Sequence, residues 1–132
     1  MTYKNITYEK EGNIGRLILN RPEAGNTLNL DLAIELFDVL NTANADKDLK
    51  ALILTGKGKL FCGGGDLNFL IEKKDNVKET LLKMTHYFHG AISRIAKLSA
   101  PVIIGINGTA GGGGFSLAIT GDIIVSISTA KF

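Results

Sequence analysis

The sequence has 132 residues, 45% of them hydrophobic and 21% charged, which is the composition of a single soluble globular domain and not of a disordered chain. Fifteen Lys and Arg residues against thirteen Asp and Glu residues leave a formal charge of +2, without the basic block or aromatic stripe of a nucleic-acid-binding protein. The polar start, the lack of an apolar segment of membrane length and the single Cys62 together predict a cytoplasmic protein with no membrane association.

The first predicted elements are a hairpin and a helix. Two short apolar runs flank Gly12 and Asn13, and they place the second strand of the hairpin at residues 14–19. Apolar residues at helical spacing predict an amphipathic helix over residues 30–43, with Asn29 as its N-cap. The remaining elements, in chain order, are a strand at 51–55, a helix starting within 66–73, a long helix within 76–100, a strand at 102–106, a helix at 115–119 and a strand at 122–128.

The longest predicted helix carries its apolar residues three and four positions apart, as one face of a helix requires. Asn76 and Glu79, at its start, have the spacing of a reciprocal capping pair. The residues expected on its buried face are Val77, Leu81, Met84, Phe88, Ala91 and Ile95.

Strands alternate with helices along the sequence, which predicts parallel strand pairing with the helices packed outside. No short-period repeat or low-complexity linker divides the chain, so we predict one α/β domain over residues 1–132. Such a fold normally covers its last strand with a helix, but the sequence stops at Phe132 directly after a predicted strand. We therefore expect these residues to be the front part of a longer chain.

Two glycine runs, at residues 63–65 and 111–114, each lie between a predicted strand and a predicted helix. Glycine at such a junction lets backbone N–H groups converge on an anionic ligand, and the helix N-terminus adds a partial positive charge. The usual phosphate-binding patterns do not fit. The dinucleotide pattern would need glycine at Asn68 and Ser116, and a P-loop would need glycine at Ala51 or Ile53.

An anion that forms only during reaction is a second candidate for these glycine runs. When a thioester is deprotonated next to its carbonyl, or attacked at its β-carbon, the carbonyl oxygen carries the developing charge. Two N–H groups from separate segments, aimed at that oxygen, would stabilise it by several kcal/mol in a site shielded from water. The alternative is that the glycines only make tight connections, but their matched positions favour a function.

Three segments resemble the crotonase superfamily, also called the enoyl-CoA hydratase/isomerase family. They are LNRPEAGNTLN at 19–29, LILTGKGKLFCGGGDL at 52–67 and INGTAGGGGFSLAITGDIIVS at 106–126. The resemblance implies a right-handed spiral of ββα turns, assembled as a trimer or a pair of trimers. It also implies an acyl-CoA thioester substrate, with coenzyme A as part of the substrate and no separate cofactor. By position, the oxyanion donors resemble the N–H groups of Gly65 and Gly113.

The resemblance extends to residues that contact the substrate in the family. The positions that match the segment along CoA and the wall around the thioester are Glu23, Ala24, Asn26, Leu28, Gly63, Gly65, Asp66 and Leu67. Simple packing is the alternative role for Leu28 and Leu67. Asp66, at a helix start, is expected to stabilise the helix N-terminus and organise the loop.

The chain departs from a hydratase at Ser116, where family hydratases carry the first of two catalytic glutamates. The second glutamate position falls beyond Phe132. A serine hydroxyl is a poor base without an activating partner, so we expect a double-bond isomerase rather than a two-glutamate hydratase. The alternatives are an enoyl-CoA hydratase, and a noncatalytic acyl-CoA-binding or oligomer module.

His86 and His89 lack a third metal ligand at suitable spacing, so we expect a surface or packing role and no metal site.

Overall fold

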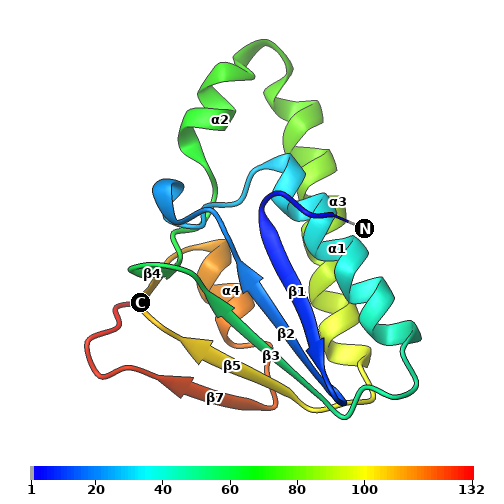
Figure 1. Ribbon diagram of the computed structural model, residues 1–132. Coiled ribbons are helices and arrows are strands. Elements are labelled where there is room, and N and C mark those ends of the chain that lie inside the picture. The colour runs from blue at the N-terminus through cyan, green and yellow to red at the C-terminus, as the bar shows by residue number, and fades with distance from the viewer. Residues whose placement is uncertain (1) are drawn as a thin grey trace.

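A five-stranded sheet forms the frame of the structure, a computed structural model that describes residues 2–132 (Figure 1). Its strand order is β1-β2-β3-β5-β7, in which β1 and β2 are antiparallel and each later pair is parallel. The strands are β1 (Ile6–Glu11), β2 (Ile14–Leu19), β3 (Ala51–Gly56), β5 (Val102–Ile106) and β7 (Ile123–Ser126). The predicted hairpin and the predicted parallel pairing are therefore confirmed.

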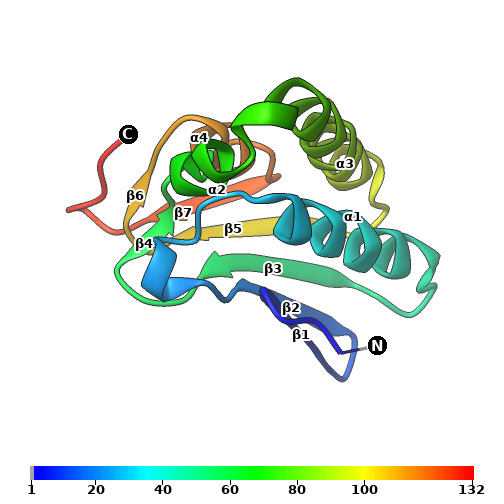
Figure 2. The same ribbon diagram turned by 90° about the horizontal axis from the view of Figure 1, so that it is seen from above.

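The helices lie on one side of this sheet, and two very short strands stand apart from it (Figure 2). These strands, β4 (Leu60–Cys62) and β6 (Thr109–Ala110), pair with each other in parallel. The helices are α1 (Leu30–Ala45), α2 (Leu67–Glu72), α3 (Val77–Lys97) and α4 (Gly113–Ala118), with single turns η1 (Pro22–Ala24) and η2 (Lys74–Asn76). The chain thus repeats a unit of long strand, short strand and helix, as β3-β4-α2 and then as β5-β6-α4.

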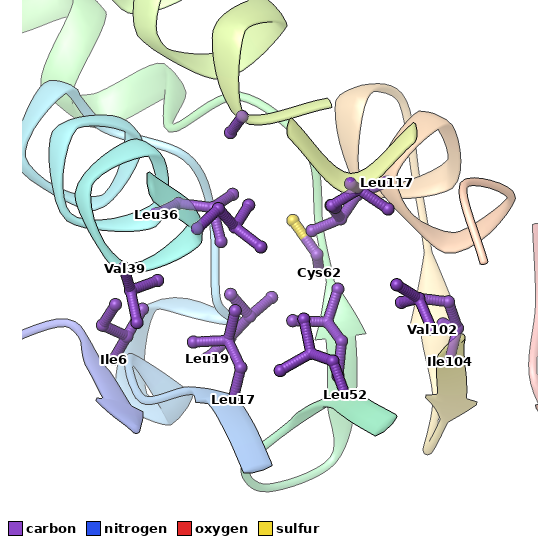
Figure 3. Close-up of a cluster of buried hydrophobic side chains, with 14 of the residues drawn as sticks. Ile6, Leu17, Leu19, Leu36, Val39, Leu52, Cys62, Val102, Ile104 and Leu117 are labelled. Atoms are coloured by element: carbon purple, nitrogen blue, oxygen red, sulfur yellow. The ribbon is translucent and has the colours of Figure 1, made fainter. Parts of the chain in front are cut away.

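The core lies between the sheet and the helices, and it follows from the alternation along each strand. In β3 and β5, every second side chain is buried and the residues between them are only half-buried, as a sheet covered on one face requires. Figure 3 shows the buried side chains of β2, β3 and β5 meeting those of α1 and α4. The largest fully buried side chains on these elements are Leu17, Leu19, Leu32, Leu36, Val39, Leu40, Leu52, Leu54, Ile104 and Leu117.

Helix α1 begins as predicted, whereas α3 differs from the prediction in its cap and in its buried face. The Asn29 side chain accepts a hydrogen bond from the Leu32 N–H at 2.9 Å, which confirms the N-cap of α1. The predicted capping pair of α3 is wrong, because η2 runs directly into α3 and the Asn76 side chain makes no capping bond. Glu79 instead pairs with Lys83 at 2.8 Å.

The buried face of α3 is also shorter than the sequence predicts. Met84, Phe88, Ala91 and Ile95 are buried as expected, but Val77 and Leu81 are exposed. The reason is visible in Figure 1, where α2 and the first turns of α3 project beyond the sheet. Within residues 2–132, no helix is both long enough and apolar enough to cross a bilayer.

The edge strand β7 is exposed along its whole length. Ile123 and Val125 are 54% and 59% exposed. An edge strand with an unpaired backbone and apolar side chains is a template for pairing with another chain. This edge is therefore the part of the surface most prone to association.

We predict that the 132-residue chain, expressed alone, associates through this edge. A double substitution, Ile123→Lys with Val125→Lys, should increase the fraction of monomer, because charge at an edge opposes strand pairing. Sedimentation velocity over a range of concentrations measures this. A stable monomer of the unsubstituted chain at all concentrations would contradict the prediction.

Candidate active site

The two glycine runs lie directly against each other. The Gly111 N–H donates to the Cys62 carbonyl at 3.0 Å, beside the parallel pair β4 and β6. A Cβ atom at Gly114 would lie 2.1 Å from that same carbonyl oxygen, and one at Gly64 would lie 2.8 Å from the Gly111 carbonyl oxygen. Gly64 also has a φ of +98°, which disfavours other residues. Tight connection therefore explains the glycines at positions 64 and 114.

Packing does not explain Gly65. Its φ is not positive, and no atom lies within 4 Å of where its Cβ would be. Within residues 2–132, neither the Gly65 N–H nor the Gly113 N–H donates a hydrogen bond, whereas the next N–H in each segment does: Asp66 bonds to Leu28 at 2.9 Å and Gly114 to Gly111 at 2.8 Å. The N–H groups of Gly65 and Gly113 are thus free to bind a ligand.

Two pockets meet at Gly65. The larger, about 720 Å³, is polar and is lined by the loop after β2 and the start of α2. The smaller, about 270 Å³, is mainly apolar and lies between α3 and α4, with Gly65, Gly113 and Ser116 on its wall. The predicted site residues on the polar pocket are Glu23, Ala24, Gly63, Gly65, Asp66 and Leu67, and Leu28 lies on the apolar pocket.

Asn26 is the one predicted contact residue that lines neither pocket. It is fully buried with a φ of 53°, and its amide nitrogen donates to the carbonyls of Lys57 and Leu60, each at 2.9 Å. Its side-chain oxygen accepts from the Arg21 N–H at 2.8 Å. In this structure, Asn26 therefore ties the loop after β2 to the segment before β4, and its side chain is not accessible to a ligand.

Asp66 joins the two sides of the polar pocket. Its carboxylate caps α2 by accepting from the Phe69 N–H at 3.1 Å, and it pairs with the Arg21 guanidinium at 3.0 Å. Burial alone would raise the pKa of Asp66, but the bonds from Phe69 and Arg21 outweigh it and lower that pKa. Arg21 also donates to the Thr27 carbonyl. The expected role of Asp66 as helix cap and loop organiser is confirmed.

Three polar side chains reach the apolar pocket: Thr85 and His89 of α3 and Ser116 of α4. From the sequence, we expected only a surface or packing role for His89 and did not predict that it lines this pocket. Its signal was its position, one turn after Thr85 and next to the predicted core residue Phe88, but the contact with α4 depends on tertiary packing. Within the described residues, no group of three or more His, Cys, Asp or Glu side chains could hold a metal ion.

Cys62 lies beneath the two loops and is fully buried. Burial raises the pKa of its thiol, although the Gly64 N–H partly offsets this. A buried thiol with a raised pKa holds little thiolate, so Cys62 is not suited to be a nucleophile. Its role is in packing.

Comparison with known proteins agrees with this geometry. Residues 9–132 match the family model described as enoyl-CoA hydratase/isomerase. The chain belongs to this family. Among curated relatives, 1,2-epoxyphenylacetyl-CoA isomerase of Escherichia coli (strain K12) is 35% identical over 92% of this chain and 47% of its own length. Crotonyl-CoA hydratase of Syntrophomonas wolfei is 37% identical over 100% of this chain and 50% of its own length.

The chain spans about half the length of the curated enoyl-CoA hydratase/isomerase relatives it matches. An enoyl-CoA hydratase structure from Polaromonas sp. JS666 superposes with a TM-score of 0.86 at 32% identity, over 95% of this chain and 49% of that one. A Legionella pneumophila structure described as an enoyl-CoA hydratase/isomerase (crotonase) gives 0.88 at 26% identity, over 98% of this chain and 50% of that one. The predicted crotonase-like fold is thereby confirmed.

The Arg21–Asp66 pair gives a prediction about stability. Asp66→Asn keeps a capping oxygen but removes the charge, so it should lower the free energy of unfolding by about 1 to 2 kcal/mol near neutral pH. The pKa of Asp66 is lowered in the folded state. The difference in the free energy of unfolding between the two proteins should therefore have its full size above about pH 5 and disappear as the pH falls through the folded pKa.

Urea unfolding at a series of pH values measures this difference. Asp75→Asn, which removes a charge from an exposed carboxylate near the start of α3, is the control for net charge. An equal effect of both substitutions, or a difference that persists at low pH, would show that the ion pair does not stabilise the loop.

Proposed function

We propose that the protein binds an acyl-CoA thioester with the carbonyl oxygen between the N–H groups of Gly65 and Gly113, and stabilises the enolate formed there. The observation that carries the proposal is that Gly65 lines both pockets and that Gly113 lines the apolar one with it. A thioester carbonyl at this junction would direct its CoA portion into the polar pocket and its acyl chain into the apolar pocket.

The polarity of the two pockets supports this orientation. Charged and polar groups of Arg21, Glu23, Asn29, Asp66 and Asn68 surround the larger pocket, which suits the polar CoA portion. Leucine, methionine and phenylalanine side chains dominate the smaller pocket, which suits an acyl chain. Two free donors at the boundary can stabilise charge that develops on the thioester oxygen.

Within this family, we propose double-bond isomerisation in preference to hydration. Ser116 lies on the apolar pocket and, among residues 2–132, no Asp or Glu lines that pocket. A hydratase needs one group to activate water and another to protonate the α-carbon, whereas an isomerase needs only to move a proton along the acyl chain. The relatives carry the names of both an isomerase and a hydratase, so their names support either branch.

Two further functions stand as alternatives. Enoyl-CoA hydration would need a carboxylate acting with Ser116, and a noncatalytic acyl-CoA-binding or oligomer module would need only the pockets.

We also propose a cytoplasmic enzyme that assembles as a trimer or a pair of trimers and uses no cofactor other than the CoA of its substrate.

The oxyanion assignment gives a prediction with a matched control. Gly65→Pro removes the N–H and should lower turnover by roughly 10²- to 10³-fold, while the CoA portion still binds. Gly65→Ala keeps the N–H in a position with open space, so it should fold normally and retain clearly more turnover.

Steady-state turnover of but-3-enoyl-CoA by the full natural chain, together with CoA affinity by calorimetry, separates these effects. Equal turnover of a correctly folded Gly65→Pro variant and the unsubstituted protein would disprove the role of the Gly65 N–H. Loss of CoA binding in both variants would place the defect in the pocket itself.

The preference for isomerisation gives another prediction. The protein should shift the double bond of but-3-enoyl-CoA, or exchange its α-protons with solvent, faster than it hydrates but-2-enoyl-CoA. Ser116→Glu should raise hydration, because it supplies a carboxylate where family hydratases carry their first catalytic glutamate. Ser116 is exposed, so the longer side chain has room there. Mass spectrometry in deuterium oxide follows exchange, and loss of enoyl absorbance follows hydration. Efficient hydration without any exchange or isomerisation would favour the hydratase alternative.

A further inference from the structure

Among residues 2–132, His89 is the one side chain with an imidazole on the apolar pocket. Its polar side chains are those of Thr85, His89 and Ser116. Hydroxyl groups of Thr and Ser stay protonated at such pH, whereas a neutral imidazole is a base. His89 is therefore the candidate for proton transfer within the pocket that holds Gly65 and Gly113.

The two hydroxyl groups are poorly suited to that role. The Thr85 hydroxyl lies 2.9 Å from the Leu81 carbonyl and 3.1 Å from the Leu82 carbonyl, so it is engaged within α3. The Ser116 hydroxyl makes no hydrogen bond among residues 2–132, and a serine without an activating partner is a weak nucleophile and a weak base.

His89 lies on a turn of α3 that packs against the second glycine run. It follows the buried Phe88, whose ring lies 6.3 Å from the imidazole between centroids. The Phe88 ring also lies 3.6 Å from where a Cβ of Gly113 would be, so this turn of α3 packs against the second glycine run. Within residues 2–132, the His89 side chain makes no hydrogen bond, which leaves its nitrogens available to a ligand.

We propose that His89 is the base that removes the α-proton of the bound acyl-CoA, an inference that rests on the proposed function. The imidazole nitrogen takes the proton, and the electron pair of the C–H bond moves into the enolate, whose oxygen is held by Gly65 and Gly113. The imidazolium then returns a proton to the α-carbon, or to the γ-carbon of an enoyl chain. Because His89 is exposed, its proton exchanges with water between the two steps.

The test compares two histidines of the same helix in the full natural chain. His89→Gln should slow α-proton exchange of but-3-enoyl-CoA in deuterium oxide by about 10²- to 10⁴-fold. His86→Gln, one turn earlier and away from the apolar pocket, should leave the rate unchanged. Calorimetry with CoA should give the same affinity for both variants, since neither residue lines the polar pocket.

Chemical rescue separates a base from a structural residue. His89→Ala should lose exchange and regain part of it when imidazole is added to the buffer, whereas Gly65→Pro should not respond to imidazole. Equal exchange rates for His89→Gln and His86→Gln would overturn the inference and leave the proposed function standing. Loss of exchange in His89→Ala without any rescue would also overturn it. No exchange or isomerisation by the unsubstituted protein, despite CoA binding, would overturn the proposed function as well.

Discussion

The contact between the two glycine runs is the constraint on which the candidate site depends. The Cys62 carbonyl accepts from the Gly111 N–H, and the same oxygen leaves no space for a side chain at Gly114. Backbone therefore meets backbone where β4 and β6 pair, and α2 and α4 start from this junction. Any larger residue at position 114 would push α4 away and separate the two free N–H groups.

The pockets follow from the same contact. Because β4 and β6 are short and end together, the segments after them turn apart and leave Gly65 between a polar and an apolar space. The Arg21–Asp66 pair and the buried Asn26 then hold the loop after β2 against the segment that contains β4 and the first glycine run. The donors are thus oriented by backbone geometry, and the polar groups around them keep that geometry fixed.

Local sequence signals predicted most of the fold. Alternation along the strands, helical spacing in α1 and the Asn29 cap are interactions between near neighbours, so they can be read without the tertiary structure. The errors at Asn76, Val77 and Leu81 arose because α3 starts from η2 and projects beyond the sheet, which no local pattern encodes. The position of His89 on the apolar pocket was not predicted for a related reason, since its neighbours across the pocket come from distant parts of the chain.

The sharing of Gly65 between the pockets has a consequence for how substrate preference can change. Substitutions along α3, for example at Leu81 or Met84, reshape only the apolar space, because α3 contributes nothing to the polar one. Under the proposed function, selectivity for the acyl chain could therefore diverge among related chains while the binding of the CoA portion and the two N–H donors stay the same. Leu81 is exposed on the first turns of α3, which project away from the core, so divergence there carries little cost in stability, whereas a change at buried Met84 also disturbs the core.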